Sequence, residues 1–258
     1  MLSSDVSGQS SGPLEKKSLR DEVFELLHRR IVSGEYPLGE WLRQEEIANE
    51  LDVSPTPVRE ALDQLVAEGL AERIPYRGVR VPELTEEEIA DAYVLRLLLE
   101  VAAVRLSSYN ISQEQANLLQ AVLRKTERLL ESDDVSAYQH LNRQLHRAIV
   151  AASGNRLLSR LYELVINRFP DWMMYRGLIE QPELRRSALG RDFEEHQVLI
   201  ELITSHEADA ASRQAMKHMH GVGEELVTWT GVSASLLRER ERQILALLPD
   251  HNGQECNS

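Results

Sequence analysis

Residues 51–69 constrain the fold most, because this short segment contains a tight turn and an amphipathic helix. Ser54 is a natural N-cap, and Pro55 falls at the first helical position, where its missing N–H costs nothing. Gly69 is expected to close the helix as its C′ residue. Apolar residues recur at helical spacing and predict a buried stripe of Val58, Ala61, Leu62 and Leu65. One face of this helix is therefore predicted to pack into a core.

The opposite face of the same helix carries polar residues suited to reading DNA. Thr56 lies in the first turn and Arg59 about one turn later. A recognition helix enters the major groove N-terminus first, where free N–H groups favour phosphate and first-turn side chains reach base edges. An ordinary helical hairpin is the alternative for this segment alone, and the residues that follow favour the recognition helix.

The flanking segments predict a winged helix-turn-helix over residues 18–82. The expected elements are helices at 19–33, 44–51 and 55–68 and strands at 70–74 and 79–81. The two strands alternate around a turn, Pro75-Tyr76-Arg77-Gly78, with basic residues at its tip and along the second strand. We expect Arg77 and Arg80 of this wing to lie along a phosphate backbone or reach into the minor groove.

Three motifs follow one another across residues 18–82: YPLGEWL, EEIANELDVSPTPVREALDQLVAEGL and YRGVRV. Their order resembles the DNA-binding domain of the GntR transcription regulators. The resemblance implies DNA contacts from Ser54, Thr56, Arg59, Arg77 and Gly78. The family usually has arginine between the Ser and Thr that open the recognition helix, whereas this chain has Pro55. The resemblance therefore implies an operator that differs from the family's usual one.

The charge of the chain does not by itself suggest DNA binding. The 258 residues include 29 Lys or Arg and 42 Asp or Glu, a formal net charge of −13. Residues 16–82 contain ten basic and thirteen acidic residues, so the predicted DNA-binding part is close to neutral. A groove contact depends on where a few arginines point rather than on overall charge. We expect modest non-specific DNA affinity and a dimer that doubles the contacts.

Composition also indicates the compartment. The single cysteine, Cys256, cannot form an internal disulfide, which fits a reducing cytoplasm. No apolar run approaches the ~20 residues needed to span a bilayer, so no membrane partner is expected. The polar N-terminus lacks the apolar core of a signal peptide. Residues 1–17 are predicted to be a disordered arm and residues 249–258 a flexible tail.

Residues 83–248 show no further strand pattern and predict an all-α helical bundle. Thr85 with Glu88, and Ser112 with Gln115, form capping boxes that open two of its helices. Seven helices are expected, near 85–108, 112–130, 134–152, 155–169, 182–205, 207–229 and 234–248. No fixed internal period appears, so a bundle is favoured over a repeat array. The whole chain is predicted to be mainly α.

Four polar residues of this predicted bundle are spaced as metal ligands. Asn142 and His146 are four residues apart and project from one helix face. His196 and His218 lie on two later helices, so the four side chains could converge on a divalent ion such as zinc, nickel or manganese. His220 competes for the last position but points elsewhere on its helix. A structural or solvated role for these histidines is the alternative.

Three segments of the bundle carry a second resemblance: LNRQLHRAIVAASGN, FEEHQVLIELI and the run from Ala211 to His218. They resemble the ligand-binding FCD domain of the FadR subfamily of GntR regulators. Many FCD domains bind a metal through an aspartate, a histidine four residues on and two later histidines. The resemblance implies ligands at Asn142, His146, His196 and His218. A neutral amide replaces the aspartate, which implies weaker metal binding.

In such domains the metal and a nearby cation hold a small carboxylate effector. Arg96 matches the family pattern R-x-x-L-E, so the resemblance implies that its guanidinium binds this acid as a bidentate partner. A salt bridge to Glu100, one helical turn on, is the alternative for Arg96. Arg168 is a further candidate for effector binding. Residues 172–175 are candidates for a pocket wall or lid, or for core or dimer contact.

The function predicted from these features is a metabolite-responsive transcription regulator, a repressor rather than an enzyme. FCD helices usually contribute to dimerisation, and a two-fold dimer would set two recognition helices ~34 Å apart on a pseudo-palindromic double-stranded operator. One alternative is a metal-free FadR-type sensor of acyl thioesters. A metal-dependent hydrolase fused to a DNA-binding head is another, although the chain has no HExxH motif.

Overall fold

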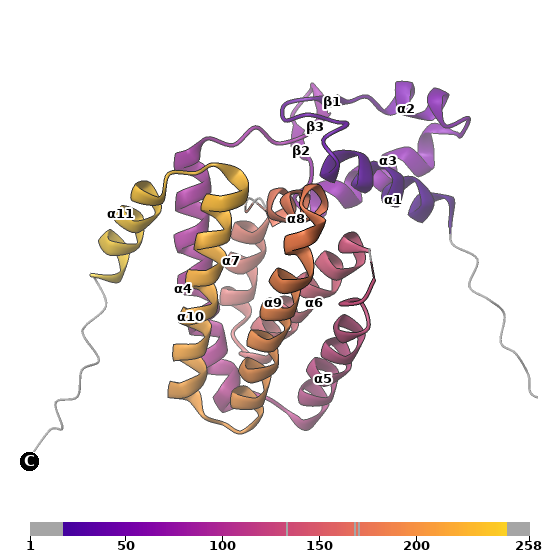
Figure 1. The fold of residues 1–258 in the computed structure, drawn as a ribbon. Coiled ribbons are helices and arrows are strands. Elements are labelled where there is room, and N and C mark those ends of the chain that lie inside the picture. The colour runs from indigo at the N-terminus through magenta and orange to yellow at the C-terminus, as the bar shows by residue number, and fades with distance from the viewer. Residues whose placement is uncertain (1–17, 133, 168, 170, 247–258) are drawn as a thin grey trace, which may run out of the picture.

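The computed structural model describes residues 18–132, 134–167, 169 and 171–246. A small N-terminal head lies at one end of a larger helical bundle (Figure 1). The described residues are mainly helical, and their one sheet is a small antiparallel one in the head, so the predicted fold class is confirmed. The predicted arm at 1–17 and tail at 249–258 lie outside the described residues.

The head has the predicted order of helices and wing. Its elements are α1 (Leu19–Val32), β1 (Trp41–Leu42), α2 (Gln44–Glu50), α3 (Pro55–Ala67), β2 (Glu72–Ile74) and β3 (Gly78–Arg80). The wing hairpin β2–β3 is joined by β1, so the antiparallel sheet has the order β1-β3-β2. The sequence did not predict β1, because two residues are too few to establish an alternating pattern.

One apolar core holds the head together. The predicted stripe of α3 is buried in it, together with residues from α1, α2 and the wing. Val58 and Leu65 are fully buried, as expected for a helix that faces a core with one side. The opposite side of α3 stays exposed and carries Thr56 and Arg59.

The start of α3 differs in detail from the prediction. Ser54 has the extended backbone of an N-cap, but its side chain makes no capping hydrogen bond. A serine N-cap normally accepts from the N–H of the second or third helical residue, and the third residue here is Pro57, which has no N–H. The exposed Ser54 hydroxyl is therefore not engaged in capping its own helix.

The bundle follows after a short linker. Its elements are α4 (Glu86–Asn110), α5 (Gln113–Glu127), α6 (Val135–Ala152), α7 (Arg156–Ile166), α8 (Asp171–Glu180), α9 (Pro182–Thr204), α10 (Ala208–Thr230) and α11 (Ala234–Leu245). Both predicted capping boxes form, at Thr85 with Glu88 and at Ser112 with Gln115. The long helix α4 packs against α10, α6 and α7 (Figure 1). It thus brings the segments that carry the predicted ligands to one part of the bundle.

The prediction of seven helices was wrong, because the described part of the bundle has eight. The additional helix is α8, which lies between the bundle and the head (Figure 1). Trp172 belongs to the core of the head, whereas Met174 and Tyr175 pack into two cores of the bundle. A helix buried on several sides has no continuous polar face, so its sequence lacks the amphipathic period used to predict helices.

Candidate functional site

The exposed face of α3 and the wing form one candidate DNA-binding surface. A groove of about 440 Å³ lies between α3, the start of α2 and the wing, and Arg59, Arg77 and Gly78 all line it. Arg59 is exposed and forms no ion pair within the described residues. Gly78 has a φ of 121°, which favours glycine at the end of the wing turn. Ser54 and Thr56 are exposed at the N-terminal end of the same helix, outside the groove lining.

Neighbouring residues that the sequence did not suggest complete this surface. Arg43 and Arg73 also line the groove, and the guanidinium of Arg77 lies 5.2 Å from the ring centroid of Trp41. Tyr76 is fully exposed at the tip of the wing. Arg80, also expected to contact DNA, is partly buried and pairs with Glu72 at 2.8 Å. Its charge is therefore partly neutralised within the wing.

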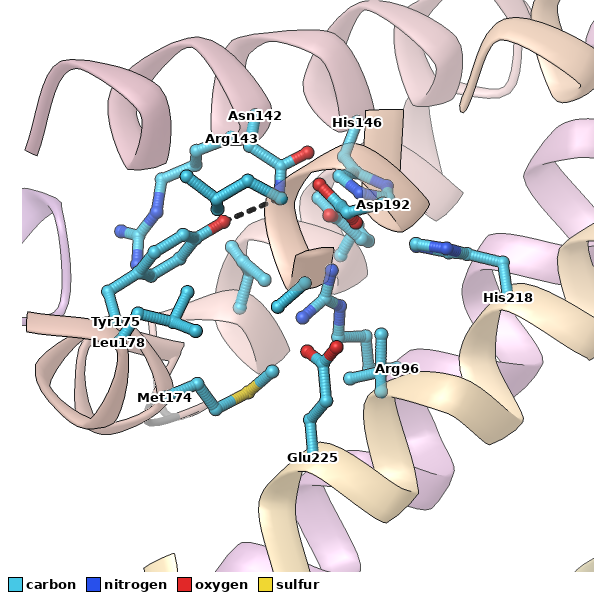
Figure 2. Close-up of a pocket in the computed structure, with 15 residues that line it drawn as sticks. Arg96, Asn142, Arg143, His146, Met174, Tyr175, Leu178, Asp192, His218 and Glu225 are labelled. Carbon is cyan, nitrogen blue, oxygen red and sulfur yellow. Dashed lines mark hydrogen bonds between the residues drawn. The ribbon is translucent and has the colours of Figure 1, made fainter. Parts of the chain in front are cut away.

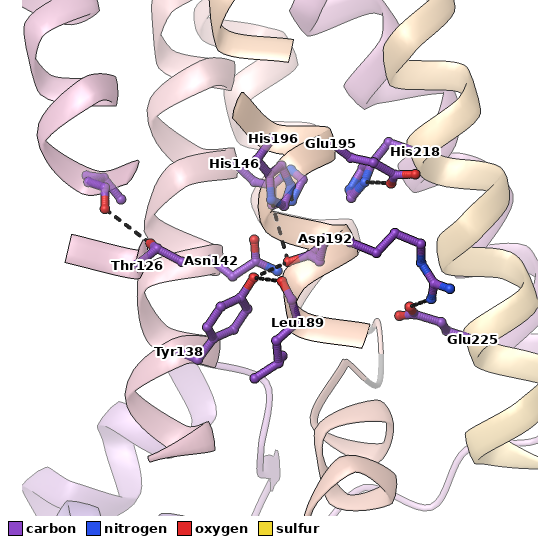
Figure 3. Close-up of polar contacts among 12 residues, drawn as sticks. Thr126, Tyr138, Asn142, His146, Leu189, Asp192, Glu195, His196, His218 and Glu225 are labelled. Atoms are coloured by element: carbon purple, nitrogen blue, oxygen red, sulfur yellow. Dashed lines mark hydrogen bonds and ion pairs between the residues drawn. The ribbon is translucent and has the colours of Figure 1, made fainter. Parts of the chain in front are cut away.

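Three of the predicted metal ligands converge inside the bundle (Figure 3). His146 lies on α6, His196 on α9 and His218 on α10, and all three are buried. Their candidate ligand nitrogens lie within 4.8 Å of one another. His220 is half exposed and faces Glu241 instead, as expected for a residue that points elsewhere on α10. Folding thus brings together imidazoles that are 50 and 22 residues apart in the chain.

The donor atoms of this cluster fit a metal ion. The Nε2 atoms of His146 and His196 are 3.1 Å apart, and two nitrogens held at ~2.0–2.1 Å by one metal lie roughly 3.0–3.4 Å apart. The Nε2 atom of His218 and the Oδ1 atom of Asn142 are buried and make no hydrogen bond within the described residues. Unpartnered buried polar atoms are costly, and a bound cation would satisfy both of these.

Asn142 itself is oriented by a neighbour on α8. Its Nδ2 donates a hydrogen bond to the Tyr175 hydroxyl at 2.7 Å, which assigns the amide nitrogen to Tyr175 and leaves Oδ1 as the possible ligand atom. The amide lines the same cavity as His146 and His218 (Figure 2). An amide oxygen in this place is uncharged, so any charge that balances a cation must come from other residues.

Each histidine of the cluster faces a carboxylate through its other ring nitrogen. His146 Nδ1 lies 2.9 Å from Glu100, His218 Nδ1 lies 3.0 Å from Glu195, and His196 Nδ1 lies 3.5 Å from Asp192. Sequence reasoning did not place any of these carboxylates beside a histidine. The spacing of Asp192 and His196, four residues apart on one helix, was the one signal that could have suggested such a contact.

The electrostatics keep these carboxylates ionised and His196 neutral. Burial would raise the pKa of Glu100, but Arg96 and His146 outweigh it and hold that pKa well below its usual range. Burial lowers the pKa of His196 to about 3. The hydrogen bond from His218 lowers the pKa of Glu195. At neutral pH the cluster thus combines anionic carboxylates with a neutral His196 imidazole, the form that binds metals.

A small cavity of about 40 Å³ extends from the histidines toward α8 (Figure 2). Its wall includes polar groups from α4, α6, α9 and α10 and apolar side chains from α8, namely Arg96, Asn142, Arg143, Asp192, Glu225, Met174 and Leu178. This volume holds an ion and a few water molecules at ~10–15 Å³ each. A larger ligand requires the wall to move outward.

Arg96 lies on this wall, and it also forms the salt bridge to Glu100 that was the alternative to effector binding. Its Nε donates to Glu100 at 2.6 Å, both side chains are buried, and its guanidinium lies 4.6 Å from the ring centroid of Phe169. Arg96 therefore lines the cavity and forms the salt bridge to Glu100 at the same time. Through its two oxygens Glu100 connects Arg96 to His146. The other predicted effector residue, Arg168, lies outside the described residues.

Two segments of the bundle, α6 and the end of α7, contact the DNA-binding head near this cavity. Arg143, next to Asn142 on α6, lines the cavity and donates a hydrogen bond to the backbone carbonyl of Glu68, the C-cap of α3. Beside it, Gly69 lies so close to α7 that a Cβ atom would stand 2.7 Å from the Asn167 carbonyl oxygen. The end of the recognition helix therefore rests directly on the domain that contains the cavity.

Two family models match these two parts of the chain. The model of bacterial regulatory proteins of the gntR family matches residues 19–81, and the FCD domain model matches residues 91–221. The chain is a GntR-family regulator with an FCD domain. The family assignment confirms a DNA-binding transcriptional regulator and not an enzyme, since the relatives named below are regulators too. No helix in the described part of this regulator is long and apolar enough to cross a lipid bilayer.

Known relatives of this GntR-family chain include two named regulators. It is 31% identical over 153 residues to the probable D-xylose utilization operon transcriptional repressor of Paenarthrobacter nicotinovorans, covering 59% of this chain and 67% of that protein. It is 29% identical over 165 residues to the regulator McbR of Escherichia coli, covering 64% and 75%. The solved structure of E. coli McbR/YncC has a TM-score of 0.61 at 25% identity, covering 83% of this chain and 99% of that one.

Proposed function

We propose that this GntR-family protein is a cytoplasmic repressor whose operator affinity is set by a small carboxylate metabolite bound in a metal-containing cavity of its FCD domain. The observation that carries this proposal is Arg143, which lines the cavity and at the same time binds the last turn of the recognition helix. A repressor is also what the names of some relatives suggest, for example the repressor GlaR of Escherichia coli.

The divalent metal in this proposal is zinc, nickel or manganese. His146, His196 and His218 would hold it, with Oδ1 of Asn142 as a weaker oxygen ligand. When bound, the metal supplies a positive Lewis-acidic centre to which a carboxylate oxygen can bind. The guanidinium of Arg96, already held by Glu100, adds a fixed positive charge to the same cavity.

The transmission of effector binding to the head follows from the size of the cavity. A metabolite larger than a few water molecules displaces the wall, and α8 contributes Met174 and Leu178 to the apolar part of that wall. Because Trp172 of the same helix is buried in the core of the head, a shift of α8 also displaces the head. The effector thus favours one placement of the recognition helices by its differential affinity.

Homodimerisation is the second part of the proposal. Helix α7 exposes an apolar stripe of Leu157, Leu161 and Leu164 at helical spacing, 43–67% exposed. Such a face on a folded domain is suited to a second copy of the chain. Two heads would then read a pseudo-palindromic operator with half-sites ~34 Å apart.

Replacing Leu161 by glutamate tests the dimer. The buried charge would convert the dimer to a monomer in analytical ultracentrifugation. Leu118→Glu is the matched control, because Leu118 is similarly exposed but lies on α5. A variant Leu161→Glu that sediments like the unmodified protein would place the interface elsewhere.

The proposed function is tested with the full-length, metal-loaded protein and DNA of its own genome. Fragments retained by the protein define the operator, and a thermal-shift screen of sugar acids, dicarboxylates and amino acids identifies acids that stabilise it. An acid that raises the melting temperature should change operator affinity measured by fluorescence anisotropy. Failure to retain any fragment, with or without acids, would refute the regulator assignment.

Chelation separates the proposal from its main alternative, a metal-free acyl-thioester sensor. Metal analysis of the purified protein, followed by melting before and after chelator treatment, gives the readout. We expect bound metal and a lower melting temperature once it is removed, because a ligand that binds only the native state stabilises it. A metal-free protein with unchanged melting would favour the acyl-thioester sensor.

A further inference from the structure

We propose that Glu100, Asp192 and Glu195 are positioning residues of the metal site, and that their charge compensates for the neutral side chain of Asn142. The inference rests on the proposed metal site and adds to it the three residues that orient its ligands. It concerns residues that contact the histidines and not the metal itself.

The first observation is the repeated geometry around the three imidazoles, and Figure 3 shows two of the carboxylates, Asp192 and Glu195, beside them. Every histidine of the cluster has a carboxylate at Nδ1, at 2.9 Å for His146, 3.0 Å for His218 and 3.5 Å for His196. A carboxylate can only accept, so Nδ1 is the protonated nitrogen where the contact is a hydrogen bond, as it is for His146 and His218. The lone pair is then on Nε2, and the Nε2 atoms of His146 and His196 face each other at 3.1 Å.

The second observation is that two of the three carboxylates, Glu100 and Glu195, reach their histidine from another helix, whereas Asp192 and His196 are four residues apart on α9. Glu100 lies on α4, whereas Asp192 and Glu195 lie on successive turns of α9. Two separate helices therefore contribute carboxylates to the site. Such partners fix the tautomer and ring orientation of a ligating histidine and raise its basicity, and their loss typically weakens metal binding about 10- to 100-fold.

The third observation concerns charge. Asn142 brings no negative charge, although its Oδ1 lies buried without a hydrogen bond in the described residues. The three carboxylates supply negative charge on the far side of each imidazole ring, and the guanidinium of Arg96 opposes it. In a buried site with low effective dielectric, charge at this distance still contributes strongly to cation binding. The three carboxylates thus provide the negative charge that the neutral Asn142 does not.

Glu195 offers the cleanest test among the three. Glu100 also binds Arg96 and Tyr162, and Asp192 also accepts from the Tyr138 hydroxyl at 2.8 Å, so their replacement disturbs other contacts. The side chain of Glu195, by contrast, bonds to His218 alone within the described residues and is partly exposed. Its neighbour Glu194 is exposed and forms no ion pair with a histidine in the described part of the chain, which makes Glu194→Gln a control of equal charge.

The experiment measures Zn²⁺ and Co²⁺ affinity of full-length Glu195→Gln by competition with a chromophoric chelator. Glutamine can still accept from Nδ1 but carries no charge, and we expect affinity to fall about 10-fold or more, with an altered Co²⁺ absorption spectrum. Glu194→Gln should match the unmodified protein. Adding Asn142→Asp to Glu195→Gln should recover affinity, because it returns a carboxylate to the centre. Melting of the metal-free variants verifies the fold.

The outcomes separate this inference from the proposed metal site. If the unmodified protein binds neither ion, the metal site itself is refuted and the inference falls with it. If the unmodified protein binds metal but Glu195→Gln and Glu194→Gln both retain its affinity and Co²⁺ spectrum, only the positioning role is refuted. A metal-free Glu195→Gln that melts far below the unmodified protein would also count against it, because the carboxylate would then be needed for folding itself.

Discussion

The head and the bundle use charged residues in opposite ways. In the head, Arg59 and Arg77 are exposed and available to a partner. In the bundle, Arg96, Glu100 and the three clustered histidines are buried and bind one another. Exposed groups can act singly because water satisfies them until a partner arrives, whereas buried ones need partners within the fold.

This contrast teaches that the two regions should respond differently to substitution. A change on the surface of the head should alter DNA affinity and leave stability almost unchanged. A change in the buried network should alter ligand binding and stability together, because each group supports its neighbours. Arg143 and α8 contact both regions, so a change there should alter DNA affinity, ligand binding and stability together.

The largest expected effect is that of His196→Ala. It removes one of three imidazoles and leaves Asp192 without its histidine partner, so metal binding and any effector response should be lost. Operator affinity should persist, because the head is unaltered. His220→Ala, on the exposed face of α10, is the control and should keep its metal. An effector response retained by His196→Ala would contradict the assigned site.

Arg59→Ala should have the next largest effect, on operator affinity alone. Loss of a base contact costs about 1–3 kcal/mol per half-site, so a dimer should lose roughly twice that. Fluorescence anisotropy with operator and unrelated DNA measures it, and the melting temperature should not change. Arg124→Ala, an exposed arginine on α5, controls for charge. Operator affinity equal to that of the unmodified protein would refute the recognition-helix assignment.

Arg143→Ala tests the connection between the two regions and should have an intermediate effect. Loss of the hydrogen bond to the Glu68 carbonyl should cost about 1–3 kcal/mol of stability and weaken the effect of an acid on operator affinity. Arg147, one turn later on α6, pairs with Glu163 at the surface, so Arg147→Ala is the control. Full effector control of DNA binding in Arg143→Ala would mean that the signal takes another route.

The smallest expected effect separates two serines at helix starts. Ser18 caps α1 in a capping box, so Ser18→Ala should lower stability by about 1 kcal/mol. Ser54 makes no capping hydrogen bond, so Ser54→Ala should leave stability unchanged and weaken DNA binding slightly. Chemical denaturation and anisotropy on both variants provide the comparison. Equal destabilisation by the two changes would show that Ser54 does cap α3 in solution.

The sequence by itself determined most of the helices and strands of this protein and their order, but neither β1 nor α8. The stripe of α3, the capping boxes of α4 and α5 and the wing turn are local patterns, because each depends on residues only a few positions apart. Short sequence motifs were also enough to recognise the family of each part. Helix α8 was missed because it has no such local pattern. Burial on several sides removes the amphipathic period from its sequence.

The tertiary structure alone decided how the functional groups meet. Which carboxylate faces His146 or His218, and whether Arg96 meets a pocket, a salt bridge or both, depends on the rotation and offset of helices far apart in the chain. The contact of Arg143 with the end of α3 joins residues from two domains. Side-chain periodicity determines which face of a helix is buried, but only packing determines what that face touches.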